Sequence, residues 1–438
     1  MSFREFRAEV ASWVQAAMTA KSLPSVNSSP VEPPRPDMGD LSLTMCFQLA
    51  KMTGQAPMDL ADTLADHPLT GFNLIESVEV VIPGYLNLKV KQPELIHRTI
   101  LDAISNKSYG KIDIGKGKTV LIEHTSVNPN KALHVGHLRN LFVGDVLYRI
   151  LSFMGYDAKV LNYIDDSGLQ VADLIIGFKF CNFELEPPSG MKFDRYCGDE
   201  VYSKVTSLYE ETPDLLLKRT QVLTDLEDKT TEIAKFRNEI VDRVLDDQLK
   251  TCWRAGASYH LLNYESHIIA YKLWDELFEL LKQKEIIEKA TKGKQKGCWV
   301  VKIDDVKQQD KVIVRSDGTA TYIAKDLSYA AWKVGLLDDA FSYGVRSKQP
   351  GEEPLWATNL ASKDSVHPKF SPADLCITVI DARQDRLQKI ISSILTKLGG
   401  PESSSEYLHL AYEVVSLDKD TAQDLGFSDG GKKAVHMS

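Results

Sequence analysis

The stretch IEHTSVNPNKALHVGHLRN, residues Ile122 to Asn140, decides the fold of this chain. It continues an apolar, β-prone run at Val120–His124 and passes through a loop-like segment of Ser, Asn and Pro. The tetrapeptide HVGH at His134–His137 comes next, and an amphipathic run from Leu138 to Phe153 follows it. This order predicts a strand, a loop and a helix whose N-terminus carries two histidines and a glycine.

That helix N-terminus is a candidate phosphate site. Free backbone N–H groups and the helix dipole favour an anion there. Gly136 allows a ligand to approach the backbone, and the imidazoles add neutral or cationic donors for a phosphate that gains charge in a transition state. By itself the tetrapeptide is more often a pair of histidines that cap an ordinary helix, so the interpretation depends on the rest of the chain.

Further motifs along the chain set the histidines in context. They are Asn162–Gln170 (NYIDDSGLQ), Arg315–Asp326 (RSDGTATYIAKD), Val379–Gln384 (VIDARQ) and Val435–Ser438 (VHMS), with Gly39-Asp40 and Pro83–Asn87 (PGYLN) near the N-terminus. Together with Ile122–Asn140, these motifs resemble the arginyl-tRNA synthetases, a family of class I aminoacyl-tRNA synthetases. The resemblance extends over nearly the whole chain and implies a Rossmann-like catalytic domain.

The composition fits a globular protein of two or three domains, since 438 residues are 43% apolar and 26% charged. No run approaches the ~18 consecutive apolar residues of a membrane span, and Met1–Arg7 lacks the apolar core of a secretory signal. The six cysteines are scattered without a C-x-x-C pair, which argues against structural zinc and against a disulfide framework.

The formal net charge of −9 counts against a nucleic-acid binder, because such proteins usually carry a basic surface. Synthetases need only local basic patches, so the acidic balance does not exclude a tRNA partner. It does lower the expectation that this chain alone binds tRNA tightly.

Residues 1–105 predict a small α+β domain. An amphipathic helix over Phe3–Ala20 and a strand pair, Val78–Ile82 and Tyr85–Val90, frame it. The resemblance implies that this domain contacts the elbow of tRNA, and a dimerisation or packing module is the alternative. A Gly- and Lys-rich linker, Asn106–Lys118, follows.

Residues 116–438 predict the catalytic domain. A second strand, Lys159–Ile164, follows the helix stop at Gly155, so the chain starts a βαβ unit of a doubly wound parallel sheet. A charged helical insertion is expected at about 185–295, and the segments at Trp299–Val301 and Val312–Val314 are expected to lead back into the sheet. The segment Tyr343–Ala373 is expected to be rich in loops.

The resemblance implies a two-step reaction in which arginine is first activated by ATP and then transferred to tRNA(Arg). His134, Gly136 and His137 would bind ATP, with His436, Met437 and Ser438 standing where many synthetases have a mobile Lys-Met-Ser-Lys-Ser loop. The first lysine of that loop is His436 here, and Lys131 is expected to replace it as the phosphate-binding lysine. ATP would bring Mg²⁺, held largely by phosphate and water, and no structural metal is expected.

Arginine is expected to be recognised through its planar guanidinium by carboxylates and neighbouring acceptors. The resemblance gives the guanidinium to Tyr322 and Asp326, which lie four apart and share a helix face, with Glu123 as a possible second carboxylate. The full expected arginine set is Glu123, Ser126, Asn128, His137, Tyr322, Asp326 and Gln384, of which Ser126, Asn128 and Gln384 match positions for the α-amino and carboxylate groups.

The sequence stops at Ser438, within the last motif, where the family pattern continues into a helical anticodon-binding domain. We therefore expect a truncated catalytic fragment, monomeric and cytoplasmic, without membrane contact, that charges tRNA poorly. A non-catalytic paralogue that binds tRNA or a partner protein is the main alternative. A small-molecule adenylate-forming ligase is another.

Overall fold

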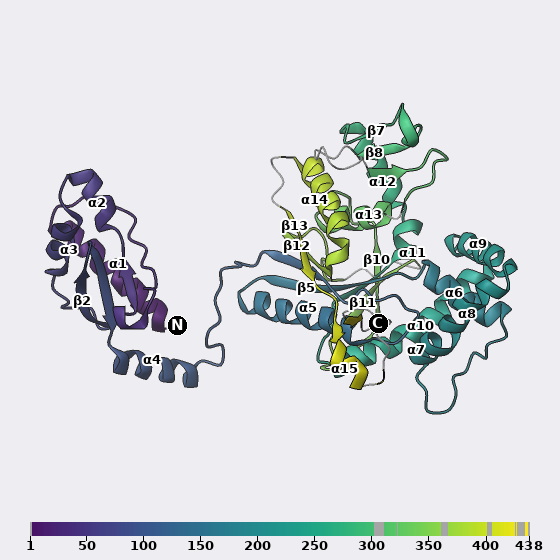
Figure 1. The fold of residues 1–438 in the computed structure, drawn as a ribbon, viewed down its shortest axis with the longest axis horizontal. Helices are drawn as coiled ribbons and strands as arrows, with labels where there is room; N and C mark the ends of the chain where they lie inside the picture. The colour runs from purple at the N-terminus through teal and green to yellow at the C-terminus, as the bar shows by residue number, and fades with distance from the viewer. Residues whose placement is uncertain are drawn as a thin grey trace. The chain divides into compact units, whose positions relative to one another are not determined.

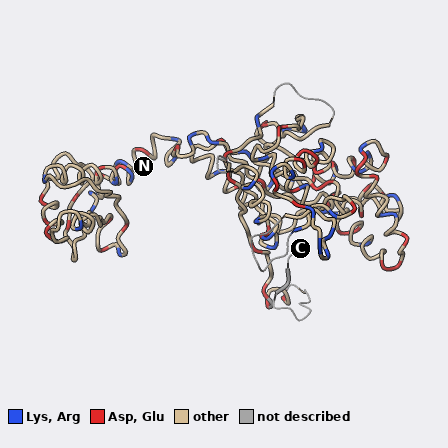
Figure 2. The backbone as a smooth tube through the Cα atoms, turned by 90° about the horizontal axis from the view of Figure 1, so that it is seen from above, with Lys and Arg blue, Asp and Glu red and all other residues tan. Residues whose placement is uncertain are grey.

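The computed structural model describes residues 2–301, 311–321, 323–360, 367–400, 405–424, 426 and 434–436. It contains two compact units, Met1–Lys111 and Ile112–Ser438, which are described separately (Figure 1). None of the described helices is long and apolar enough to span a membrane. Positions of Lys and Arg are interspersed with positions of Asp and Glu along the backbone of both units (Figure 2).

The N-terminal unit is a three-stranded antiparallel sheet covered by helices. Its elements are α1 (Ser2–Ala20), β1 (Leu41–Leu43), α2 (Cys46–Thr53), α3 (Pro57–Ala65), β2 (Ile75–Val81), β3 (Tyr85–Val90) and α4 (Gln92–Ser105), with the strands in the order β1-β3-β2. Phe6, Val10 and Trp13 recur at helical spacing on α1 and are fully buried in the core of this unit. The unit therefore has its own hydrophobic core.

The second unit is built on a seven-stranded sheet. Its strands, in spatial order, are β10 (Ser342–Lys348), β11 (Pro354–Asn359), β6 (Leu261–Tyr264), β5 (Asp157–Ile164), β4 (Thr119–Glu123), β12 (Leu375–Asp381) and β13 (Glu406–Tyr412). Every neighbouring pair is parallel except β10 and β11. The predicted fold class, a doubly wound parallel sheet preceded by a small α+β unit, is confirmed.

The order of the strands reverses beside β4. The chain runs outward from β4 through β5 and β6 to β11 and β10, then returns to place β12 on the other side of β4. Such a switch point leaves a crevice beyond the carboxyl ends of the two central strands. Ligands of doubly wound sheets bind in that crevice, so Glu123 and Asp381 mark where a site is expected.

Alternate residues of β4 face different helices. Leu121 packs into the core formed with α13 (Ile323–Lys333) and α14 (Asp385–Gly399), whereas Val120 and Ile122 pack against α5 (Val135–Phe153). Figure 1 shows α5 on one side of the sheet and α14 on the other. Because both faces are covered, the strand is a continuous apolar run, as buried parallel strands generally are.

The helical insertion is shorter than predicted. Its helices are α6 (Leu169–Phe180), α7 (Phe193–Tyr196), α8 (Ser203–Glu211), α9 (Asp214–Glu227) and α10 (Glu232–Arg254), with a π-helical stretch at Cys197–Tyr202. The chain then returns to the main sheet as β6, inside the range 185–295 expected to be helical. A strand of four residues between helices is too short to show a strand periodicity, which explains the error.

Two other segments also differ from expectation. Residues 299–301 and 311–314 are strands, but β8 (Trp299–Val301) and β9 (Lys311–Val314) join β7 (Ile287–Lys289) in a separate antiparallel sheet. This sheet lies beside α12 (Leu273–Gln283), which follows α11 (Glu265–Ala270). The region expected to be loop-rich contains β10 and β11, paired as a hairpin at the edge of the main sheet. Near the C-terminus lie β14 (Ser416–Asp418), α15 (Lys419–Asp424) and β15 (Ala434–His436).

Candidate active site

Two adjoining cavities open at the switch point. The histidine pocket, of about 520 Å³, is lined by Glu123, Thr125, Ser126, Lys131, His134, Gly136, His137, Asn140, Thr378 to Asp381, Arg383, Tyr412, Val414 and Val415. The acidic pocket, of about 400 Å³, is lined by Glu123, Ser126, Asn128, Tyr163, Asp165, Gly168, Glu265, Lys325, Asp326, Tyr329, Lys333, Thr378, Ile380, Gln384, Leu387, Gln388 and Tyr407. Both pockets share a wall made of Glu123, Ser126, Thr378 and Ile380.

The two histidines are locked to the start of α5. His134 is the N-cap residue, and its Nδ1 accepts a hydrogen bond of 3.1 Å from the backbone N–H of Gly136. The Nδ1 of His137 accepts from the backbone N–H of His134 at 3.3 Å, so the pair forms a reciprocal capping box. The rings stack with their centroids 3.5 Å apart.

Burial is the main influence on the charge of both rings. Burial and the nearby Lys131 ammonium lower the pKa of His134, and burial, His134 and Lys131 lower the pKa of His137 to about 3. Both rings are therefore neutral near pH 7, and the cationic alternative is not supported. Since each Nδ1 accepts a hydrogen bond, the remaining proton lies on Nε2, which is left as a donor.

The turn between β4 and α5 is held in an unusual backbone conformation. Thr125 and Ser126 have positive φ angles of 68° and 43°, which are uncommon for residues with a side chain. The backbone N–H of Thr125 donates to Asn140 Oδ1 at 2.6 Å, and that of Ser126 donates to Asn162 Oδ1 at 2.9 Å. Strained backbone held by buried partners is a common property of functional sites.

Asn140 also connects this turn to the far side of the crevice. Its Nδ2 donates to the backbone carbonyl of Val379 at 2.8 Å and to the Tyr412 hydroxyl at 3.2 Å. One buried amide thus fixes β4, β12 and β13 around the histidine pocket. The local sequence pattern around Asn140 gives no sign of this role, because Val379 and Tyr412 lie more than 200 positions away.

The predicted ATP residues divide between described and undescribed parts of the chain. Lys131, His134, Gly136 and His137 all line the histidine pocket. His436 ends β15, whose backbone pairs with β14. The His436 side chain, Met437 and Ser438 lie outside the described residues, so their predicted roles stay predictions.

The predicted arginine residues gather mainly in the acidic pocket. Asn128, Asp326 and Gln384 line it, with Glu123 and Ser126 in the wall that it shares with the histidine pocket. Among them Asn128 is fixed by donating from its amide to Gln170 on α6. The remaining members differ: His137 lines the histidine pocket instead, and Tyr322 lies outside the described residues.

Glu123 already has a cationic partner within the protein. Its carboxylate forms a buried ion pair with the Nζ of Lys333, which also donates to Thr378 Oγ1 at 3.2 Å. Glu123, the possible second carboxylate for a guanidinium, is thus already paired within the protein, and its role toward a guanidinium stays a prediction. The sequence did not show this pairing, because Lys333 comes from α13, far along the chain, and no local pattern reveals it.

Three further charged residues of the acidic pocket were missed. Glu265 accepts hydrogen bonds from Lys325 Nζ at 2.5 Å, from Tyr163 at 2.8 Å and from Ser167. Asp165 and Lys325 stand within motifs that the sequence analysis quoted, so their positions gave a usable signal. Glu265 directly follows β6, a short strand that was predicted to be helical. No sequence signal therefore pointed to Glu265.

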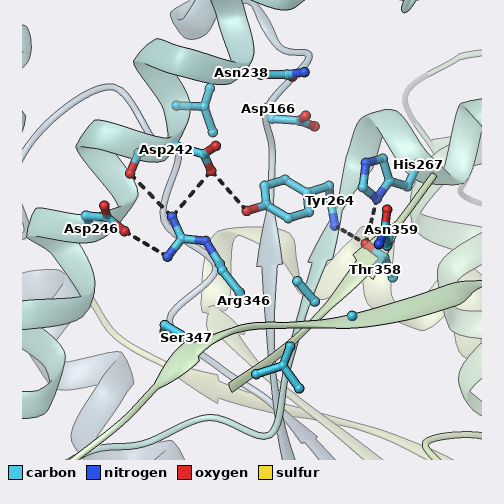
Figure 3. Close-up of a pocket in the computed structure, with 14 residues that line it drawn as sticks. Asp166, Asn238, Asp242, Asp246, Tyr264, His267, Arg346, Ser347, Thr358 and Asn359 are labelled. Atoms are coloured by element: carbon cyan, nitrogen blue, oxygen red, sulfur yellow. Dashed lines mark hydrogen bonds and ion pairs between the residues drawn. The ribbon is translucent and has the colours of Figure 1, made fainter. Parts of the chain in front are cut away.

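A third cavity, of about 570 Å³, lies between α10, β6 and the β10–β11 hairpin. Figure 3 shows the guanidinium of Arg346 reaching Asp246 at 2.8 Å and Asp242 at 3.3 Å. His267 is bonded to Thr358 Oγ1 at 2.8 Å. None of the predicted site residues lines this cavity, and the charge of Arg346 is already balanced by two carboxylates. The histidine and acidic pockets are therefore the better candidate site.

The described residues contain no group of three or more His, Cys, Asp or Glu side chains placed to hold a metal ion. Two carboxylates of the acidic pocket, Glu265 and Glu123, are instead paired with Lys325 and Lys333.

The parallel sheet, its switch point and the two adjoining pockets match the catalytic domain of a class I aminoacyl-tRNA synthetase. A family model described as "tRNA synthetases class I (R), catalytic domain" matches residues 99–350, and another, "Arginyl tRNA synthetase N terminal domain", matches residues 5–90. The chain belongs to the arginyl-tRNA synthetase family, as the sequence motifs predicted.

Individual relatives agree with the family match. The arginine–tRNA ligase of Pyrococcus abyssi is 34% identical over 398 residues, which are 87% of this chain and 62% of that protein. The enzyme of Deinococcus radiodurans is 30% identical over 440 residues, covering 99% of this chain and 67% of that one. The solved arginyl-tRNA synthetase of Thermus thermophilus matches with a TM-score of 0.73 and 31% identity, over 94% of this chain and 66% of that one. This chain thus spans about two thirds or slightly less of each of these relatives.

Proposed function

We propose that this chain catalyses the ATP-dependent ligation of L-arginine to tRNA(Arg) through an arginyl-adenylate. The observation that carries the proposal is the wall shared by the two pockets, made of Glu123, Ser126, Thr378 and Ile380. It separates a set of phosphate donors from a set of carboxylates. A cationic amino acid in one pocket can therefore present its carboxylate to a nucleotide in the other.

In the first step, a carboxylate oxygen of arginine attacks the α-phosphorus of ATP. The bond from that phosphorus to the bridging oxygen breaks, and pyrophosphate leaves. In the second step, a ribose hydroxyl at the 3′ end of tRNA attacks the acyl carbon, and AMP leaves as the hydroxyl proton is lost. Neither step requires a nucleophilic side chain, so positioning and stabilisation of phosphate charge suffice.

The histidine pocket would stabilise the charge that develops on the phosphates. The Nε2–H groups of His134 and His137 are fixed donors, because their Nδ1 atoms are held by the backbone. Lys131 lines the same pocket and brings a positive charge. Such preorganised donors act most strongly where charge appears in the transition state. Mg²⁺ bound to the ATP phosphates would offset part of their charge.

The acidic pocket would hold the arginine side chain. Asp326 lies on α13, and its carboxylate has no hydrogen bond or ion pair to a residue that the structure describes. A guanidinium would supply that partner through two parallel hydrogen bonds. An uncharged analogue such as citrulline would leave the carboxylate buried without a cation, and that cost can discriminate by ~10⁴.

The remaining parts of the proposal concern partners and organisation. The N-terminal unit would contact tRNA, and the second unit would carry out the chemistry. We expect a monomer in the cytoplasm, where proteins are made.

The test is arginine-dependent ATP–pyrophosphate exchange, measured with and without tRNA(Arg). We expect exchange with arginine and none with citrulline. Asp326→Asn should raise the KM for arginine by about 100-fold and leave the KM for ATP nearly unchanged, because it removes one charge-assisted contact.

The matched control is Asp157→Asn, which removes the same charge from the exposed start of β5. It should leave both KM values unchanged. If the wild-type chain bound arginine but showed no exchange even with tRNA, a non-catalytic role would replace the proposal.

A further inference from the structure

The side-chain amide of Asn140 is held in one orientation by backbone groups. Its Oδ1 accepts a hydrogen bond from the backbone N–H of Thr125 at 2.6 Å. Its Nδ2 donates to the backbone carbonyl of Val379 at 2.8 Å and to the hydroxyl oxygen of Tyr412 at 3.2 Å. A backbone N–H can only donate and a carbonyl can only accept, so the amide cannot be flipped. Both of its N–H groups are therefore used.

This orientation decides the role of the Tyr412 hydroxyl. A phenolic hydroxyl has one hydrogen to donate, and its oxygen can accept. Because the oxygen accepts from Asn140, the hydroxyl hydrogen has to point toward another acceptor. No described residue accepts that hydrogen. Tyr412 ends β13, lines the histidine pocket and is only partly buried, so the hydrogen is available to a ligand there.

Tyr412 reaches the histidine pocket from a different element than the donors described above. His134 and His137 lie at the start of α5, and Lys131 lies in the loop before it. Tyr412 comes from β13, the edge strand of the sheet. A donor on this strand would hold a ligand from a second direction, which restricts its orientation more than donors from one helix end do.

We propose that the Tyr412 hydroxyl donates a hydrogen bond to an oxygen of ATP, and that Asn140 is the positioning residue that turns the hydroxyl toward the nucleotide. The assignment rests on the proposed function and adds a binding residue to it. Tyr412 lies between the VIDARQ and VHMS motifs and belongs to neither. The acceptor is an oxygen of the ribose or of the phosphates, and the experiment below distinguishes the two.

Asn140 is suited to this positioning role. Its side chain is buried, with 3% of the residue exposed, and all of its partners are fixed by α5, by the turn after β4 or by the ends of β12 and β13. A buried amide with satisfied partners has little freedom to move. Since it offers Tyr412 only an N–H, the hydroxyl cannot turn and give its hydrogen to the amide.

The experiment measures the binding of ATP, adenosine and L-arginine to the whole chain by isothermal titration calorimetry. Tyr412→Phe removes the hydroxyl and keeps the ring. It should weaken ATP about 5- to 20-fold, as the loss of one uncharged donor does, and leave arginine unchanged. If adenosine weakens by the same factor, the acceptor is a ribose oxygen. If only ATP weakens, the acceptor is a phosphate oxygen.

Tyr148→Phe is the matched control. It removes the same hydroxyl from a described tyrosine of α5 that packs against His260 and lines neither pocket. It should change none of the three affinities.

The positioning role of Asn140 is tested by Asn140→Asp. The new carboxylate would accept the hydroxyl hydrogen of Tyr412, so this variant should also weaken ATP, and adding Tyr412→Phe to it should cause little further loss. Losses that multiply in the double variant would mean that Asn140 does not act through Tyr412. Thermal unfolding checks the fold of each variant. If Asn140→Asp does not fold, Tyr412→Phe still decides whether the hydroxyl binds ATP.

Other outcomes separate this assignment from the proposed function. If wild-type binds ATP and Tyr412→Phe binds it equally well, the assignment of Tyr412 is overturned and the proposed function stands. Equal weakening of ATP and arginine would also overturn the assignment, because it would indicate a general disturbance of the site. If wild-type binds neither ATP nor arginine, the proposed function fails and the assignment fails with it.

Discussion

At the scale of single residues, the histidine pair is defined by which nitrogen carries the proton. Backbone N–H groups occupy both Nδ1 atoms, so the Nε2 atoms are the donors offered to a ligand. The sequence could place His134 and His137 at a helix N-terminus, but it could not choose the tautomer. That choice depends on the capping box, which is a three-dimensional feature of the first turn.

This assignment predicts a difference between two substitutions of His137. Glutamine places its amide N–H near the position of Nε2, whereas asparagine places it near Nδ1. His137→Asn should lower the rate of ATP–pyrophosphate exchange by ~10²–10³, as loss of one transition-state donor does. His137→Gln should retain clearly more activity. Equal losses in both variants would show that the donor position is not what matters.

The sequence motifs predicted many of the residues that line the pockets, but they did not predict which carboxylates are paired with lysines. Lys131, His134, Gly136 and His137 were placed from sequence, and they line one pocket. The pairing of Glu123 with Lys333 was missed, because an ion pair between β4 and α13 leaves no trace in either local pattern. Charge neutralisation in a buried pocket is a property of the folded chain.

At the scale of elements, α5 has to lie very close to the loop that precedes it. A Cβ atom on Gly144 would lie 2.3 Å from Cγ of His124. His124 is fully buried, and its Nδ1 is bonded to Thr125 Oγ1 at 2.9 Å. The imidazole therefore has little freedom to move away, and the glycine sets the distance between helix and loop.

Gly144→Ala should lower the free energy of unfolding by about 1–3 kcal/mol, the usual cost of overpacking. It should also weaken ATP binding, because α5 carries both histidines. The control Val146→Ala, at an exposed position of the same helix, should change stability by no more than about 0.5 kcal/mol. Urea unfolding measures the stability of both variants. Comparable losses of stability in the two variants would contradict the packing argument.

Elements with a strong pattern were predicted well, and short ones were not. The βαβ unit of β4, α5 and β5 follows from its apolar runs and from Gly155, which has a positive φ of 84°. β6 has only four residues and comes between helices, so its short sequence could not be distinguished from a helical segment. The hairpin of β10 and β11 was missed because its residues do not alternate strictly in burial.

At the scale of the whole molecule, the acidic pocket lowers stability as pH rises. The folded-state pKa values of Asp165 and Asp326 are each raised from 3.8 to about 7. The folded chain thus binds protons more tightly than the unfolded chain between pH 4 and 7, and its stability falls across that range. The charged neighbours of Asp165 are Glu265, Lys325 and Asp166, and those of Asp326 are Glu265, Glu123, Asp165 and Lys333.

The free chain should therefore melt at a lower temperature at pH 8 than at pH 5.5 through this contribution. The melting temperature of the double variant Asp165→Asn/Asp326→Asn should fall less between pH 5.5 and pH 8 than that of the wild-type chain. Differential scanning calorimetry at several pH values makes the comparison. Parallel curves for wild-type and the double variant would mean that these carboxyls titrate normally.

The position of β12 has a consequence for how the protein is made. β4 pairs directly with β12, although Ile122 and its partner Ile377 are more than 250 residues apart in the chain. A ribosome synthesises β4, α5 and the helical insertion long before the strand that completes the crevice. Contacts so distant in sequence close slowly, and the nascent chain exposes the apolar edge of β4 meanwhile. The proposed site for ATP and arginine would thus form only after the last described strands of the sheet have left the ribosome, so neither ligand would assist the earlier stages of folding.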